Sequence, residues 1–150
     1  MNHKRIAVIG GGAAGLMAAI AAAGSGGQVT LLEPNERLGK KLNITGKGRC
    51  NVTNNCSREE LLRNIPRNGR FLYGAFARFD SRDAMAFFET LGVPLKTERG
   101  NRVFPQSDCA FDVSGALRRR CDRLGVRWFR DRAVYVETAE RRDCGVPGEK

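Results

Sequence analysis

The sequence has no hydrophobic run long enough to cross a membrane. Its apolar stretch from Ala13 to Ala23 is short, rich in alanine and preceded by glycines, whereas a membrane span needs about 20 mainly apolar residues. The basic start followed by apolar residues superficially fits a secretory signal, but three consecutive glycines argue against one. We therefore expect a cytoplasmic protein that does not associate with membranes.

Histidine and paired cysteines are also scarce. His3 is the only histidine, and the 5 cysteines include no C-x-x-C pair. This pattern fits neither a disulfide framework nor a zinc site, and we predict no metal site. Cys50 has cationic neighbours, Lys47 and Arg49, which can lower the pKa of a thiol. Because no other histidine exists to activate Cys50, we interpret it as a structural or cofactor-loop residue and not as a nucleophile.

Acidic residues are outnumbered by basic ones, 16 to 26, for a formal net charge of +10. This charge favours anionic partners without identifying them. One basic cluster lies in a glycine-containing loop and consists of Arg37, Lys40, Lys41, Lys47 and Arg49. A second cluster consists of Arg118, Arg119, Arg120, Arg123, Arg127, Arg130 and Arg132. We interpret the first as functional and the second as a solvated helix face or a nucleic-acid-binding surface, although no known nucleic-acid-binding motif supports the latter.

The order of apolar segments predicts an α/β protein. With 150 residues of ordinary composition, the chain has room for one folded core. Residues 4–9 and 28–33 are β-branched apolar runs typical of buried parallel strands, and residues 13–24 between them favour a helix, which together make a βαβ unit. Residues 126–129 predict a third parallel strand, and residues 133–137 a strand that leaves the sheet. We therefore predict a Rossmann-type parallel sheet with inserted helices, and the glycine motif and family resemblance given below extend this to an incomplete FAD/NAD(P)-binding sheet.

The segment between the second and third parallel strands contains the inserted elements. Residues 34–56 form a loop too long to be an idle connection. Ser57 and Glu60 have the spacing of a capping box for a short helix, and residues 70–79 and 81–91 predict two more helices. The core stripe of the last one is Ala84, Phe87, Phe88 and Leu91. Residues 97–104 predict a hairpin, and Asp112 is expected to cap a helix that ends at Leu124. Residues 138–150 are expected to be a frayed polar tail.

A glycine motif stands between the first predicted strand and its helix. Gly10, Gly12 and Gly15 match G-x-G-x-x-G, in which the first glycine permits the tight turn, the second lets a diphosphate approach, and the third lets helix and strand pack closely. Glu33 ends the second strand, where a carboxylate accepts hydrogen bonds from ribose hydroxyls and repels a 2′-phosphate. This motif predicts a dinucleotide site that disfavours NADP, but it does not separate FAD from NAD. A simple NAD-binding dehydrogenase domain stays open at this point.

The loop after Glu33 carries a resemblance to a known family. Residues 38–54, LGKKLNITGKGRCNVTN, resemble the signature loop of the BaiN-like, aminoacetone-oxidase-type FAD-binding flavoproteins, within the wider group with two dinucleotide-binding domains. The similarity continues through residues 71–73, 86–88, 92–100 and 102–105 and covers the chain up to about Glu137. One departure is the sequence Arg37-Leu38-Gly39-Lys40, where the wider group often has R-x-G-G.

The resemblance implies an FAD-dependent oxidoreductase with NAD(P)H as the electron donor. The cofactor-binding residues that it implies at the diphosphate are Gly10, Gly12, Ala13, Ala14 and Gly15. Glu33 is implied at the adenosine ribose and Val134 at adenine. The residues implied along the diphosphate and toward the flavin are Lys41, Gly48, Arg49, Cys50 and Asn51. Its members are linked to reduction of carbon–carbon double bonds in steroid-like molecules and in ribosomal RNA, so RNA is one candidate partner. The physiological substrate and the catalytic residues are not identified.

Family members have roughly 400 residues, which is what an FAD fold with an inserted second domain needs. We therefore expect residues 1–137 to be the N-terminal part of an FAD-binding domain. The substrate domain and the C-terminal FAD motif would be absent, and the chain would be inactive alone.

Overall fold

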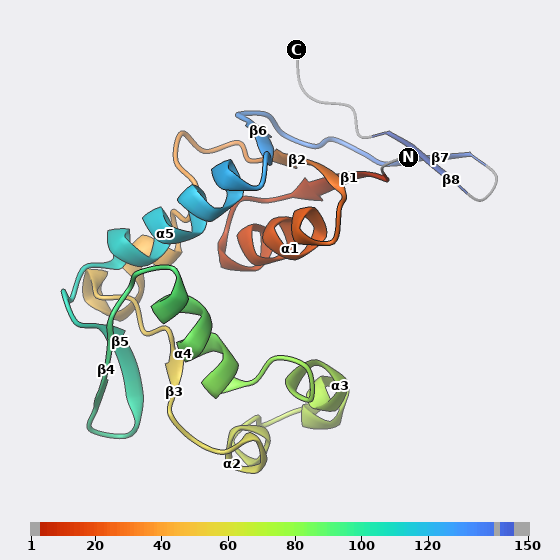
Figure 1. The fold of residues 1–150 in the computed structure, drawn as a ribbon. Coiled ribbons are helices and arrows are strands. Elements are labelled where there is room, and N and C mark those ends of the chain that lie inside the picture. Colours follow the sequence, from red (N-terminus) through yellow and green to blue (C-terminus); the bar gives the residue numbers. More distant parts are fainter. Residues whose placement is uncertain (1–3, 140–141, 146–150) are drawn as a thin grey trace. The chain divides into compact units, whose positions relative to one another are not determined.

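The computed structural model describes residues 4–139 and 142–145. The chain divides into two compact units: unit 1 is Met1–Leu42 with Leu117–Lys150, and unit 2 is Asn43–Ala116. Each unit contains a three-stranded sheet of its own, and the strands and helices are labelled in Figure 1.

The sheet of unit 1 is parallel. Strands β1 (Arg5–Ile9), β2 (Gln28–Leu32) and β6 (Arg127–Phe129) pair in the order β1-β2-β6. Helix α1 (Ala13–Gly24) connects β1 to β2, so the predicted βαβ unit is present. These elements confirm the α/β class and the third parallel strand.

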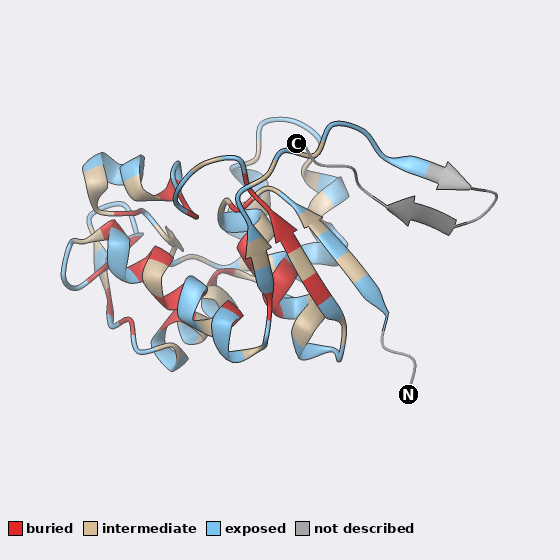
Figure 2. Cartoon of the chain, turned by 90° about the horizontal axis from the view of Figure 1, so that it is seen from above, coloured by how far each residue is buried: buried red, intermediate tan, exposed pale blue. Residues whose placement is uncertain are grey.

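The core of unit 1 lies between this sheet and its helices. β2 is the central strand, and its residues Val29 and Leu31 are buried together with Leu16 of α1. The C-terminal part of helix α5 (Ala110–Arg123) packs on α1, where Cys121 Sγ lies 3.9 Å from the backbone oxygen of Leu16. Buried and exposed positions alternate around the helices, as amphipathic helices require (Figure 2).

The sheet of unit 2 is antiparallel. β4 (Leu95–Glu98) and β5 (Arg102–Pro105) form the predicted hairpin, which turns through Gly100 and Asn101, both with positive φ. The short strand β3 (Thr53–Asn54), which the sequence did not reveal, pairs with β5. The other short elements of unit 2 are η1 (Leu42–Gly48), α2 (Arg58–Arg63), η2 (Gly69–Leu72) and α3 (Tyr73–Phe76). The first residue of η1, Leu42, belongs to unit 1.

Two helices of unit 2 begin at side-chain caps. Ser57 Oγ accepts a hydrogen bond from the backbone N–H of Glu60 at 3.2 Å, which confirms the predicted cap of α2. Helix α4 (Ser81–Thr90) begins at Asp80, whose carboxylate and that of Asp83 form a reciprocal capping box. In the predicted core stripe of α4, Phe88 is buried and the other three residues are half-buried.

Several sequence expectations require correction. The single helix expected over 70–79 is the short element η2 followed by the short helix α3, which ends at Phe76. Helix α5 begins at Ala110, so Asp112 lies in its first turn and is not its cap. The turn before it, in which the N–H of Asp108 donates to the backbone oxygen of Pro105 at 3.0 Å, brings the chain into the helix earlier than the side-chain pattern suggested. The strand expected over 133–137 begins only at Glu137.

The segment expected to be a frayed tail contains a strand pair. β7 (Glu137–Ala139) and β8 (Arg142–Gly145) are antiparallel. Residues 140–141 and 146–150 of that expected tail lie outside the described residues.

Candidate cofactor-binding site

The turn between β1 and α1 has the geometry that the glycine motif predicts. Gly10 has a φ of +97°, a value that favours glycine, and its N–H donates to the backbone oxygen of Leu32 at 2.8 Å. A Cβ atom on Gly15 would overlap the backbone oxygen of Gly10. Gly15 therefore lets α1 lie directly against the turn.

The N-terminus of α1 is open for a ligand. Gly12 is the N-cap residue, no side chain caps the helix, and no acidic residue lies in its first turn. Ala13 and Ala14 are exposed, and a Cβ atom on Gly12 would meet no atom within 4 Å. The first N–H groups of a helix have no partner inside it and carry partial positive charge. They can therefore bind an anion that comes close to the backbone.

Glu33 is buried at the end of β2, 8% exposed. Its Oε2 accepts from the N–H of Gly11 at 2.7 Å, and its Oε1 accepts from the N–H of Asn35 at 2.9 Å. Burial alone would raise the pKa of Glu33. The hydrogen bonds from Asn35 and Gly11, together with the charge of Lys40, outweigh burial and hold the pKa below its ordinary value. A carboxylate has about four acceptor positions, so Oε2 can still accept a ribose hydroxyl.

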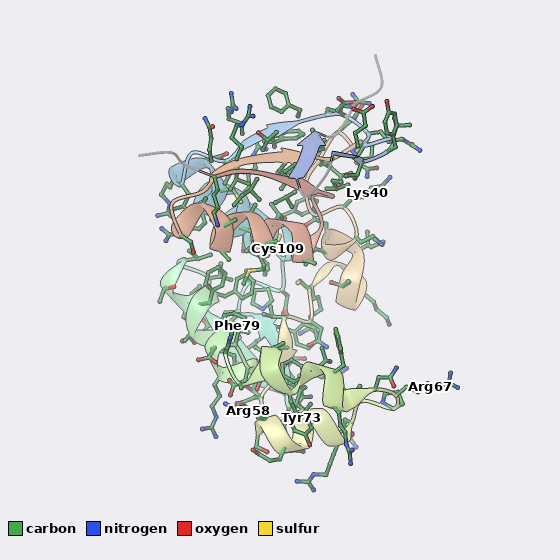
Figure 3. All side chains as sticks on the ribbon, turned by 90° about the vertical axis from the view of Figure 1, so that its right-hand side faces the viewer. Lys40, Arg58, Arg67, Tyr73, Phe79 and Cys109 are labelled. Carbon is green, nitrogen blue, oxygen red and sulfur yellow. The ribbon has the colours of Figure 1, made fainter. Side chains whose placement is uncertain are left out.

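Three supporting residues escaped the sequence analysis. A Cβ atom on Gly11 would overlap Leu38 Cδ2 and lie 3.0 Å from Glu33 Cβ, so a larger residue there would have to displace the Leu38 side chain. Gly39 has a φ of +73° and donates its N–H to the backbone oxygen of Gly11 at 2.8 Å. Asn35 donates its backbone N–H to Glu33 Oε1, and its Oδ1 accepts a hydrogen bond from Lys40 Nζ at 3.1 Å. Lys40 is labelled in Figure 3. The position of Asn35, two residues after the glutamate that ends the strand, was the sequence signal that could have predicted its hydrogen bond to Glu33.

Arg49 holds the part of the signature loop that lies in unit 2, residues 43–54. Its guanidinium pairs with Glu98, donates from Nε to Asp108 Oδ1 at 2.8 Å, and lies over the Phe104 ring at 4.2 Å from the centroid. Lys96 Nζ joins the network at 2.6 Å from Asp108 Oδ2. The carboxylates raise the pKa of Arg49, while the Arg49 hydrogen bond lowers the pKa of Glu98, and those from Lys96 and Arg49 lower the pKa of Asp108. Arg49 therefore connects this loop to the β4–β5 hairpin.

Cys50 is buried, with a φ of +60°. Burial raises the pKa of its thiol, and the hydrogen bond with Thr45 only partly opposes this. The pKa of Cys50 is thus shifted in the direction opposite to that of an activated thiol, and its role in the cofactor loop stays a prediction.

The other predicted residues are distributed over both units. In unit 1, the glycine turn and Glu33 are joined by a hydrogen bond, while Lys41 and Val134 are exposed. In unit 2, Gly48 has a φ of +86°, and the side-chain amide of Asn51 faces the backbone oxygens of Val103 and Thr53. Their contacts with a cofactor stay predictions.

Membrane-spanning helices and clustered metal ligands are both absent from residues 4–139 and 142–145. No helix there is long and apolar enough to cross a membrane. No group of 3 or more histidine, cysteine, aspartate or glutamate side chains there could hold a metal ion.

A sequence profile of the HI0933-like protein Rossmann domain matches residues 4–146. The chain belongs to this family. The HI0933-like family is one of FAD-dependent oxidoreductases, so the resemblance noted in the sequence and the Rossmann type of the sheet are confirmed.

Curated relatives of this HI0933-like chain are enzymes about three times as long. The 3-dehydro-bile acid delta(4,6)-reductase of Clostridium scindens is 39% identical over 128 residues, which are 84% of this chain and 31% of the relative. The ribosomal RNA dihydrouridine synthase of Haemophilus influenzae is 28% identical over 120 residues, 80% of this chain and 29% of the relative. The chain thus spans about a third of the length of these relatives.

Among solved structures, THI4 of Thermovibrio ammonificans resembles the HI0933-like chain with a TM-score of 0.63 and 17% sequence identity. The match covers 98% of this chain and 47% of THI4. At this identity the likeness concerns the fold alone.

Proposed function

We propose that this chain is the FAD-binding segment of a flavin-dependent NAD(P)H oxidoreductase. The observation that carries the proposal is the uncapped N-terminus of α1, where Gly12 leaves the backbone open to a diphosphate. Glu33, fixed by two backbone N–H groups, would accept a hydrogen bond from the adenosine ribose. Family membership favours FAD over NAD as the dinucleotide.

The remaining assignments concern the two ends of the cofactor. The exposed Val134 would pair through its backbone with adenine, and Lys41 would add positive charge beside the diphosphate. The loop with Gly48, Arg49, Cys50 and Asn51 would extend toward the flavin. Because Arg49 is already paired with two carboxylates, we assign it the role of holding that loop in place.

FAD, when bound, supplies the capacity to accept and donate a hydride. What this chain's residues contribute is binding and orientation: N–H groups at the diphosphate and a carboxylate at the ribose. The relatives named as a bile acid reductase and a ribosomal RNA dihydrouridine synthase favour reduction of a carbon–carbon double bond as the parent reaction. We also propose a cytoplasmic location, which agrees with the free thiols of Cys50, Cys56, Cys109 and Cys121.

A second candidate function is RNA binding, alone or as part of the same enzyme. The cluster from Arg118 to Arg132 is mostly exposed. Acidic residues lie near part of the cluster: Arg118 lies 4.0 Å from Asp122, and Arg130 lies 3.4 Å from Glu36. The name of the ribosomal RNA dihydrouridine synthase supports this candidate, and the net charge of +10 agrees with it.

The first experiment is an FAD titration followed by the change in flavin fluorescence. We expect weak binding by the 150-residue chain, with loss of flavin absorbance on gel filtration, because the contacts proposed for unit 1 hold the diphosphate and the adenosine end of FAD and leave the flavin less constrained. Gly12→Val should weaken binding at least about tenfold while the chain stays folded, because a Cβ atom there meets no protein atom.

Gly24→Val is the matched control, since Gly24 lies at the other end of α1 and is equally unobstructed. It should leave the FAD affinity unchanged. Equal FAD affinity of the wild-type chain and Gly12→Val would show that the diphosphate site is assigned wrongly.

A further inference from the structure

Unit 2 contains a cavity that the proposed cofactor site does not use. It has a volume of about 590 Å³ and lies among α2, η2 and the start of α3. Small-molecule sites commonly measure about 300–1,000 Å³. Its lining includes Arg58, Glu59, Leu62, Arg63, Arg70 and Tyr73.

The charge of this cavity is positive. Three arginines and one carboxylate, that of Glu59, line it. Arg58 also pairs with Asp80 at 3.5 Å, and Arg63 Nε donates to the backbone oxygen of Glu59 at 3.4 Å. Within the part of the chain that the structure describes, neither Arg63 nor Arg70 has an ion pair with a carboxylate. Two guanidinium groups therefore remain for an anion.

Arg58 contributes a buried donor that lacks an acceptor. Its Nε atom is buried and has no hydrogen-bond partner among the described residues. A buried N–H without an acceptor is unfavourable, and an anion oxygen that reached Nε as the Arg58 side chain shifted would satisfy it. This unpaired N–H of Arg58 supports anion binding independently of the positive charge of the cavity.

Tyr73 supplies a ring beside these cations. It is 56% exposed although it lines the cavity, so a face of its ring can receive a planar group. Figure 3 shows Tyr73 and Arg58 at the same end of unit 2, with Arg67 extending away from them. Arginines beside an exposed aromatic ring suit a phosphate joined to a nucleobase.

We propose that this cavity binds a nucleoside phosphate, with the phosphate on Arg63 and Arg70, the base against Tyr73, and one phosphate oxygen on Arg58 Nε after a shift of the Arg58 side chain that exposes this atom. The guanidinium groups of Arg63 and Arg70, which have no ion pair among the described residues, match the double charge of a terminal phosphate better than the single charge of a carboxylate. A free nucleotide and a unit of single-stranded RNA both join a phosphate to a base, and they differ in that the phosphodiester of RNA carries a single negative charge.

The test is isothermal titration calorimetry of the chain with cytidine 5′-monophosphate, cytidine, inorganic phosphate and a single-stranded cytidylate octamer. The monophosphate should bind more tightly than cytidine or phosphate. Arg70→Gln should weaken its binding about tenfold, and Tyr73→Leu at least about fivefold. Arg67→Gln is the matched control and should leave monophosphate binding unchanged.

The octamer distinguishes the two sources. Tighter binding of the octamer that also weakens with Arg67→Gln assigns the cavity to RNA, while equal affinity for octamer and monophosphate assigns it to a free nucleotide. Absence of monophosphate and octamer binding, or binding that Arg70→Gln and Tyr73→Leu leave unchanged, overturns the proposal.

A pyrimidine nucleotide also separates this cavity from the FAD proposal. Gly12→Val should remove FAD binding and keep cytidine monophosphate binding. Loss of both ligands with Gly12→Val, in a chain that stays folded, would place the nucleotide at the α1 turn and overturn the cavity assignment.

Discussion

Glu33 shows how one side chain combines a structural and a binding role. Its carboxylate accepts N–H groups from residues on both sides of the β1–α1–β2 connection. Glu33→Gln places an NH2 group opposite one of these donors. We expect it to lower the free energy of unfolding by about 1–3 kcal/mol at pH 7.

The effect of Glu33→Gln should depend on pH. Because the folded chain holds the pKa of Glu33 below its ordinary value of 4.5, the carboxylate stabilises the fold at higher pH and loses this effect as pH falls through the lowered pKa. Urea unfolding of both proteins from pH 7 to pH 3 should show the difference between them shrinking below about pH 4.5. A difference that is constant over this range would mean that Glu33 acts through its shape and not through its charge.

At the scale of elements, the contact between α1 and the preceding turn depends on Gly15. Gly15→Ala would force a Cβ atom onto the backbone oxygen of Gly10, so the helix or the turn must move. We expect a loss of about 1–3 kcal/mol in the free energy of unfolding, measured by urea denaturation with circular dichroism.

Gly24→Ala tests the same helix without the contact. Nothing lies within 4 Å of a Cβ atom at Gly24, so this change should be neutral or stabilising by up to about 1 kcal/mol. If Gly15→Ala proved as neutral or stabilising as Gly24→Ala, close packing of α1 on the turn would not be what requires glycine at position 15.

At the scale of the whole molecule, the net charge of +10 makes a prediction for the RNA alternative. If the basic residues bind phosphates, the logarithm of the affinity for a single-stranded RNA should fall linearly with the logarithm of salt, with a slope of about −0.7 for each phosphate contacted. This slope can be measured by fluorescence anisotropy with a labelled oligonucleotide at salt concentrations from about 50 to about 300 mM. Absence of binding at moderate salt would exclude the alternative.

Much of unit 1 was predictable because its signals are local. The apolar runs, the glycines between strand and helix, and Glu33 lie within one βαβ connection, and strand and helix differ in their side-chain period. The family signature loop was equally visible in the sequence. The cap of α2 was also foreseen, since Ser57 and Glu60 are three residues apart in a known pattern.

What tertiary structure alone decided are contacts between residues far apart in sequence. The bond from Gly11 to Glu33, the pairing of Arg49 with Glu98 and Asp108, and the short strand β3 beside β5 leave no periodic pattern. The sequence determined the parallel βαβ framework and its glycine turn. The folded chain determined that Glu33 is held by backbone donors, that Arg49 is paired with acids and that Arg58 Nε is buried without an acceptor, because partner choice and burial depend on which segments meet in space.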